Sequence, residues 1–284
     1  MSGAKRPTLR HLARQAARRA LTLVTCQAHN TVPISRALAD YLSVHAGAPV
    51  EFRADVPWPD AYRGVAEGAF DIAWICGWPY TQLAAGGAAV DLLAAPVMAG
   101  GRYGGRPVYF SDVVVQRDSP FTRFTDLRGA SWAYNEPGSQ SGYHITRYEL
   151  ARLGEDGSFF GRVVASGAHQ RSLAMILAGD VDASAIDSTV LEWELAHAPG
   201  LAEKIRIIAT WGPSPSPPLV AATAQSRAAL PALRRALLEL PVSPAGRHLL
   251  QSGGLAAFAV VSDADYDPIR AMEAVAAGID LVRT

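Results

Sequence analysis

The sequence of 284 residues has few cysteines, almost no lysine and no net charge. Cys26 and Cys76 are its only cysteines, which is too few for a disulfide scaffold, and neither lies in a metal-ligand spacing. Lys plus Arg and Asp plus Glu number 26 each, and this balance argues against a general nucleic-acid or membrane-surface binder. No hydrophobic run reaches the length of a membrane-spanning helix.

The N-terminal segment is basic: Lys5 and five arginines precede the apolar run at residues 20–25. This order resembles a signal peptide, but the apolar run is shorter than the core of an export signal and no small-x-small cleavage site follows. We therefore expect residues 1–19 to form a basic arm and residues 20–27 to form the first core strand. As written, the chain is expected to be cytoplasmic.

Apolar runs and helix-spaced segments alternate through the first hundred residues, which is typical of a parallel α/β sheet. The continuous apolar run at residues 70–76 is expected for a central strand that is covered on both faces. The strands predicted in this part of the chain are 20–27, 50–54, 70–76 and 90–98, and the predicted helices include 32–42 and 61–67. A later helix is predicted at 231–240.

Two connectors, near residues 106–111 and 209–212, divide the chain into nested parts. Residues 20–107 and 212–284 are predicted to form the first lobe, and residues 108–211 to form an inserted second lobe. Two α/β lobes joined by two strands enclose a cleft with hinges, and ligands bind there at the carboxyl ends of strands.

The stretch from Trp132 to Gly154 carries the strongest site signal. A short apolar run ends at Tyr134, Pro and Gly residues break it, and a helix pattern begins at Ser141. The turn residues Ser139, Gln140, Ser141 and Gly142 would present unpaired N–H groups, the positive end of a helix dipole and two hydroxyls, which suits an anion. Gly142 would let a ligand approach the backbone closely. The alternative is that the serines only cap the helix.

Five further residues are candidates for the same cleft. His169 precedes a helix, Asp187 ends a strand, and Trp58, Trp78 and Tyr109 lie beside turns or strand ends. The alternatives are a surface histidine, a helix-capping aspartate and ordinary core aromatics.

Catalytic motifs are missing: there is no Walker loop, no HExxH and no GxSxG. Ser141, His169 and Asp187 suggest a hydrolase trio, but Ser141 opens a helix among donors that suit the holding of an anion. We therefore predict a binding protein rather than an enzyme, with no metal and no cofactor.

Several separated phrases carry a family resemblance: FDIAWICGWPY, YFSDVVVQRDSP, YNEPGSQSGYHITR, VVASGAHQRSLAMILAGDVDASAIDS and GPSPSPP. Over roughly residues 20–270 the chain resembles the phosphate/phosphite/phosphonate substrate-binding proteins of ABC importers, which have the type II periplasmic-binding fold. The resemblance implies that residues 139–142 correspond to the family's Ser-x-Ser-Gly helix start, which holds phosphoryl oxygens. It also implies that residues 166–169 correspond to its SGSH turn, that Trp58 corresponds to its cleft aromatic, and that Tyr109 belongs to its crossover motif.

The function implied by this resemblance is the capture of a small phosphorus oxyanion, namely phosphate, phosphite or an alkylphosphonate, by a monomer that serves an ABC permease. Thr189 and Pro217 occupy positions where members that grip aminoalkyl phosphonates have carboxylates, which argues against an aminophosphonate ligand. Because the chain lacks a convincing export signal, two alternatives stay open: a cytoplasmic enzyme on the same fold, and a cytoplasmic ligand sensor that acts through the basic arm.

Overall fold

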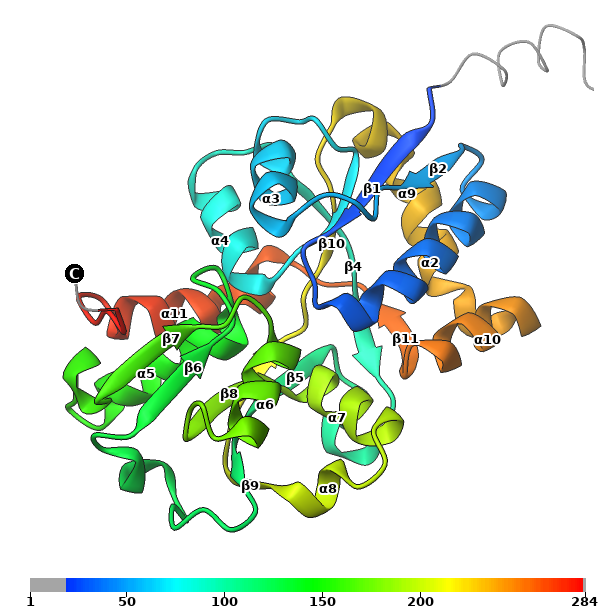
Figure 1. Cartoon of the computed structure of the whole chain (residues 1–284). Helices are drawn as coiled ribbons and strands as arrows, with labels where there is room; N and C mark the ends of the chain where they lie inside the picture. Colours follow the sequence, from blue (N-terminus) through cyan, green and yellow to red (C-terminus); the bar gives the residue numbers. More distant parts are fainter. Residues whose placement is uncertain (1–18, 283–284) are drawn as a thin grey trace, which may run out of the picture.

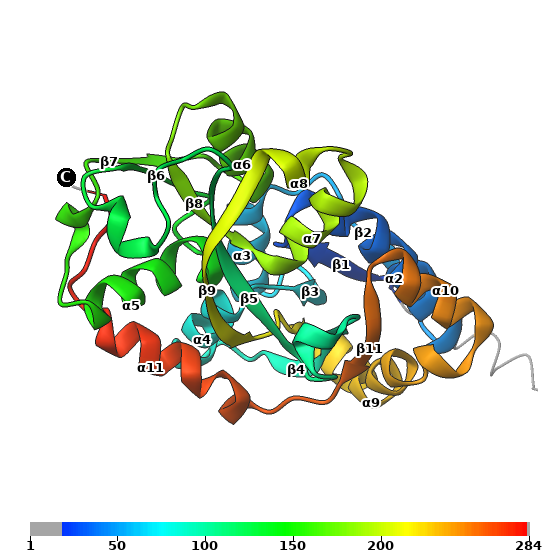
Figure 2. The same ribbon diagram turned by 90° about the horizontal axis from the view of Figure 1, so that it is seen from below.

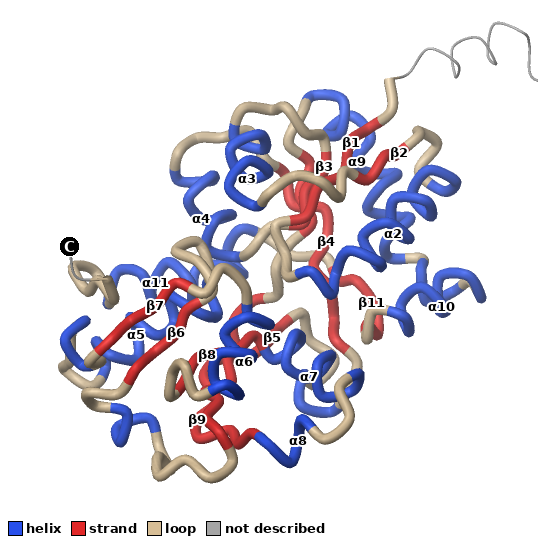
Figure 3. Tube along the Cα trace, viewed as in Figure 1, coloured by secondary structure: helices blue, strands red, loops and turns tan. Residues whose placement is uncertain are grey.

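Two β-sheets, each covered by helices on both faces, form the two lobes of the protein in the computed structural model, which describes residues 19–282 (Figure 1). Figure 3 shows strands running through the middle of each lobe, with helices outside them. The predicted basic arm lies outside the described residues, except for Arg19.

The first lobe is built on a six-stranded mixed sheet with the strand order β11-β4-β10-β3-β1-β2. Strand β1 is parallel to β2 and β3, β10 is antiparallel to β3 and β4, and β11 is antiparallel to β4. The strands are β1 (Leu21–Thr25), β2 (Val50–Phe52), β3 (Ile72–Trp74), β4 (Asp91–Met98), β10 (Leu219–Ala221) and β11 (Leu255–Ala259). The helices are α2 (Val32–His45), α3 (Trp58–Ala66), α4 (Gly77–Ala85), α9 (Ala224–Leu238) and α10 (Pro244–Ser252).

Both faces of this sheet are buried, which is why its central strands are largely apolar. Leu21 and Leu23 belong to the core beneath α2, α9 and α10, whereas Val24 and Ile75 belong to the core beneath α3 and α4. The central strand predicted from the run at residues 70–76 is therefore confirmed.

The second lobe is built on a five-stranded sheet with the order β7-β6-β8-β5-β9, in which β6 is parallel to β7 and β8, and β5 is antiparallel to β8 and β9. Its strands are β5 (Val108–Gln116), β6 (Ser131–Tyr134), β7 (Arg162–Ala165), β8 (Ala183–Asp187) and β9 (Ile205–Pro215). Its helices are α5 (Ile145–Arg152), α6 (His169–Ala178), α7 (Ser188–His197) and α8 (Leu201–Lys204).

Short helical turns occur along the whole described chain. They are η1 (His29–Thr31), η2 (Gly101–Tyr103), η3 (Phe124–Leu127), η4 (Gln140–His144), η5 (Gly157–Phe159), η6 (Leu240–Val242) and η7 (Asp263–Tyr266).

Two crossovers connect the lobes close to the predicted connectors. The first runs from β4 through η2 into β5. The second lies between β9 and β10, slightly later than predicted, because β9 keeps pairing with β5 as far as Pro215 opposite Val108. The N–H of Ser216 donates to the carbonyl of Pro107 at 2.9 Å, so the two crossovers run side by side.

The C-terminal segment contacts both lobes, although the sequence prediction placed all of residues 212–284 in the first lobe. Helix α11 (Asp267–Val275) lies beside α4 and α5 in both ribbon views (Figures 1 and 2). Leu281 is 1% exposed within the core of the second lobe, and Asp280 accepts a hydrogen bond from the Tyr143 hydroxyl at 2.7 Å. The chain therefore passes between the lobes a third time, near its C-terminus.

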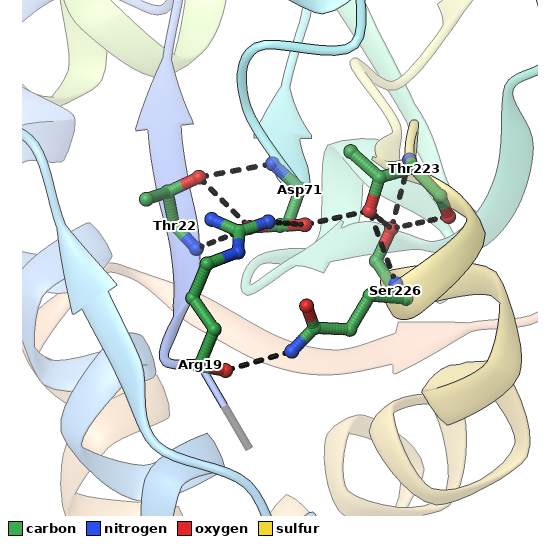
Figure 4. Close-up of polar contacts among 6 residues, drawn as sticks. Arg19, Thr22, Asp71, Thr223 and Ser226 are labelled. Atoms are coloured by element: carbon green, nitrogen blue, oxygen red, sulfur yellow. Dashed lines mark hydrogen bonds and ion pairs between the residues drawn. The ribbon is translucent and has the colours of Figure 1, made fainter. Parts of the chain in front are cut away.

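A buried carboxylate, Asp71, joins the start of β1 to the start of α9 (Figure 4). It accepts hydrogen bonds from the N–H and hydroxyl of Thr22 at 2.9 and 3.1 Å and from the Thr223 hydroxyl at 2.6 Å. The guanidinium of Arg19 pairs with it at 2.9 Å. These bonds offset the free-energy cost of taking the charge out of water.

Two elements differ from the sequence prediction. Helix α9 begins at Ala224 rather than Pro231, because Thr223 and Ser226 form a capping box upstream and Pro231 lies inside the helix. Strand β11 was not predicted, since LAAFA is short and has no β-branched residue. Its pairing with β4 determines the strand instead.

Candidate ligand-binding site

The turn at residues 139–142 opens a helix, as the sequence predicts, but its first turn, η4, is a π-helix that continues into α5. The Ser139 Oγ accepts the N–H of Gly142 at 3.0 Å. The Ser139 carbonyl accepts the N–H groups of both Tyr143 and His144, at 3.2 and 3.0 Å. Ser139 is therefore a helix cap, whereas Ser141 has no capping role.

Ser141 connects this turn to the start of α6. Its Oγ lies 3.0 Å from Nε2 of His169 and 3.4 Å from the Oγ of Ser139. All three side chains are at most 5% exposed. Burial lowers the pKa of the His169 imidazole to about 4, so the ring is neutral at pH 7. The result is a row of neutral hydrogen-bonding groups shared by two helix starts.

Gly142 and Gln140 have other roles in the structure than direct approach to a ligand. A Cβ on Gly142 would lie 2.0 Å from Oδ1 of Asn135 and 3.2 Å from Cε1 of His169, so only glycine lets the turn pack against these two residues. The Gln140 side chain points away from the cleft, and its Nε2 contacts the sulfur of Met272 in α11 at 3.3 Å.

A first cavity of about 170 Å³ lies between the lobes at this turn. Four helices begin at it: α3 at Trp58 and α6 at His169, α4 after its N-cap Cys76, and α7 after its N-cap Asp187. Each helix N-terminus has a partial positive charge and unpaired N–H groups, so their convergence favours an anion. Figure 1 shows α3 and α4 on one side of this region and α6 and α7 on the other. The cavity is lined by Cys26, Gln27, Ala28, His29, Thr31, Trp58, Cys76, Asn135, Glu136, Ser139, Ser141, Gly167, Ala168, His169, Asp187, Thr189 and Val190.

The described lining of the first cavity includes two carboxyl groups and no Lys or Arg. Asp187 caps α7, as the alternative interpretation proposed, and its Oδ1 accepts the N–H and the hydroxyl of Thr189 at 2.8 and 2.7 Å. It also lines the cavity, and burial raises its pKa to about 6. Burial raises the pKa of Glu136 further, to about 8. At pH 7 the Glu136 carboxyl is thus mostly protonated and available as a donor.

The three candidate aromatics occupy different places. Trp58 lines the first cavity. Tyr109 is 1% exposed, lines a second, neighbouring cavity, and has no hydrogen-bond partner for its hydroxyl among the described residues. Trp78 lines neither cavity. It stacks on His144 with ring centroids 4.0 Å apart, and its Nε1 donates to Glu273 of α11 at 3.1 Å.

The arrangement of Ser141, His169 and Asp187 does not match a catalytic triad. Asp187 uses its Oδ1 for Thr189, and Nδ1 of His169 has no hydrogen-bond partner among the described residues. A triad needs that nitrogen to be held by the acid, so that the ring keeps the correct tautomer. The geometry leaves Ser141 with a neutral partner and without an oriented base.

Several cavity residues were not predicted, most importantly Glu136, Asn135, Cys26 and Cys76. Each follows a parallel strand closely: β1 ends at Thr25, β3 at Trp74 and β6 at Tyr134. The carboxyl ends of parallel strands meet at one edge of a sheet, so position after these strands was the available signal. Both cysteines are free thiols in the structure.

Within residues 19–282, no helix combines the length and the apolar character needed to cross a bilayer, and no group of three or more potential metal ligands comes together.

Comparisons with known proteins agree with this architecture. The family model of phosphonate ABC-transporter periplasmic substrate-binding proteins matches residues 24–266. A binding-protein component of an ABC phosphonate transporter from Pseudomonas aeruginosa has a TM-score of 0.79 at 18% identity, over 90% of this chain and 86% of that one. PhnD1 from Prochlorococcus marinus, solved with methylphosphonate, has a TM-score of 0.76 at 16% identity, over 90% and 97%. The aliphatic sulphonate-binding protein SsuA from Escherichia coli has a TM-score of 0.56 at 15% identity, over 93% and 91%. The predicted type II periplasmic-binding fold is confirmed.

Proposed function

The chain belongs to the phosphonate-binding family of periplasmic substrate-binding proteins of ABC transporters, and from this premise we propose that it captures a small phosphorus oxyanion, such as phosphate, phosphite or an alkylphosphonate, for an ABC permease. The observation that carries the proposal is the row Ser139–Ser141–His169 at the start of two helices, on the wall of the first cavity. The three side chains of this row are uncharged at pH 7 and can form hydrogen bonds with an anion.

A proton on the ligand distinguishes phosphorus oxyanions from sulfate in this proposal. Among the described residues the first cavity is lined by no Lys or Arg, and Asp187 in its wall, which is mostly ionised at pH 7, disfavours an anion that has no proton to share. A phosphorus oxyanion can carry a P–OH group near neutral pH, and this group donates to a carboxylate, whereas sulfate has no such proton. The ionised Asp187 also repels a second negative charge on the ligand.

The proposed role is binding rather than turnover. Ground-state affinity requires donors that match the ligand, and the first cavity offers them; acceleration of a reaction requires an oriented acid or base as well. The free Nδ1 of His169 supports the binding role.

Isothermal titration calorimetry of the whole chain against phosphate, phosphite, methylphosphonate and sulfate tests the proposal. We expect at least one phosphorus ligand to bind at least tenfold more tightly than sulfate at pH 7. Equal affinity for sulfate, or no binding by any phosphorus ligand, would reject it.

A further inference from the structure

A second and larger cavity, of about 490 Å³, adjoins the first between the two lobes. Gln27, Thr31 and Thr189 line both cavities and form the boundary between them. A volume of this size is in the range that houses a whole organic ligand of about 300–1,000 Å³ pocket volume. A single methylphosphonate in the first cavity would leave this space unused.

The walls of the second cavity are largely apolar and come from both lobes: Ile34, Trp74, Met98, Trp193, Pro217 and Leu255. The polar atom of Trp74 is already satisfied, because its Nε1 donates to the carbonyl of Pro217 at 3.0 Å. Trp193 stacks on His197 with ring centroids 4.2 Å apart. Both indoles would therefore contact a ligand mainly through the faces of their rings rather than through their N–H groups.

Charged side chains are scarce in the wall of the second cavity. Glu192 is its only lining Asp, Glu, Lys or Arg among the described residues, and it pairs with Arg102 at 3.1 Å. Two buried hydroxyls, those of Tyr109 and Ser216, line the cavity without hydrogen-bond partners in the described part of the chain.

We propose that the ligand is an organophosphorus oxyanion with a bulky uncharged substituent, aryl or branched alkyl, whose oxyanion occupies the first cavity and whose substituent fills the second. This inference rests on the proposed function for the oxyanion. A phosphonate and a phosphate monoester share the required chemistry, which is a phosphorus oxyanion head that can take up a proton and an apolar body. Burial of roughly 100 Å² more apolar surface than a methyl group offers would tighten binding about 10- to 100-fold.

Calorimetry with methylphosphonate, phenylphosphonate and phenyl phosphate tests this proposal on the whole chain. We expect both phenyl ligands to bind about 10- to 100-fold more tightly than methylphosphonate; a preference for one of them identifies the linkage at phosphorus. Equal affinity of phenylphosphonate and methylphosphonate would overturn the inference and leave the proposed function intact. Absence of binding by all three, with phosphate or phosphite still bound, would also overturn the inference alone; absence of binding by phosphate and phosphite as well would overturn both.

A variant that fills the second cavity tests whether the substituent of the ligand lies there. Ala196 of α7 is exposed to the second cavity and does not line the first, so Ala196→Trp reduces the second cavity without touching the Ser139–Ser141–His169 row. We expect phenylphosphonate affinity to fall at least tenfold while methylphosphonate affinity stays within about twofold. Ala202→Trp on the exposed surface of α8 is the matched control, since Ala202 lines neither cavity. An equal loss for both ligands in Ala196→Trp, or an unchanged phenylphosphonate affinity, would contradict the assignment.

Discussion

The hydroxyl of Ser141 should contribute more to ligand affinity than any other single side-chain group in the first cavity. It is 2% exposed and lies between the Oγ of Ser139 and Nε2 of His169. The substitution Ser141→Ala removes one donor to the oxyanion, and it also takes away the partner that orients the His169 ring. The backbone turn should survive, because the cap of η4 is made by Ser139 and not by Ser141.

The size of the effect follows from the charge of the ligand. A hydrogen bond to a charged group contributes about 1.5–3 kcal/mol. Each 1.4 kcal/mol corresponds to a factor of about ten in the dissociation constant, so Ser141→Ala should weaken binding by about 10- to 100-fold. Since His169 is neutral at pH 7, no loss of a charge–charge attraction adds to this figure.

Calorimetry against the tightest phosphorus ligand measures this change, and circular dichroism verifies the fold. Ser184→Ala is the matched control: Ser184 is a fully buried serine in β8 of the same lobe, it lines neither cavity, and its Oγ only contacts the Ala185 carbonyl at 3.4 Å. An unchanged dissociation constant in Ser141→Ala, or an equal loss in Ser184→Ala, would refute the reasoning.

Three further predictions concern the carboxylates. At pH 7.5 Asp187 is ionised, because its raised pKa of about 6 lies below that pH; Asp187→Asn should therefore improve sulfate binding relative to methylphosphonate, and an unchanged ratio by calorimetry would leave Asp187 as a helix cap only. The Glu136 carboxyl loses its proton and becomes negatively charged as the pH rises through about 8. The affinity of the wild type should therefore fall by up to about tenfold per pH unit above pH 8, relative to that of Glu136→Gln for the same ligand. Parallel pH profiles of the two affinities would contradict this. Asp71→Asn leaves the Thr22 and Thr223 donors of Figure 4 without their carboxylate acceptor, and urea unfolding should show a loss of about 2–4 kcal/mol; a loss below about 1 kcal/mol would mean that the buried cluster does not stabilise the fold.

Much of the fold could be predicted from hydrophobic periodicity. The apolar run predicted at residues 70–76 contains strand β3 (Ile72–Trp74), which is covered on both faces, and the Pro- and Gly-containing break before Ser139 does precede a helix start. Strand β11 and the beginning of α9 escaped prediction, because the first depends on its pairing with β4 and the second on a capping box that lies upstream of a misleading proline.

The site was predictable where a residue's position follows from a strand end or a helix start. Ser139, Ser141, His169 and Asp187 come together for that reason. Trp78 does not, because its neighbours are set by the third passage of the chain between the lobes, and this passage leaves no local pattern. Glu136 follows β6 closely, which was a signal for a place at the cleft, but the path of the loop at residues 135–138 puts its carboxyl in the cavity wall, and the sequence does not indicate that path.

The most direct test of the central claim, that the first cavity holds a phosphorus oxyanion, is a crystal structure of the protein with methylphosphonate bound. We expect the phosphonate oxygens to lie within about 3 Å of the Oγ of Ser141 and of a second donor among Ser139, His169 and the N–H groups of η4. A methylphosphonate bound elsewhere on the protein, with the Ser139–Ser141–His169 row unaltered and no ligand between the lobes, would contradict the account.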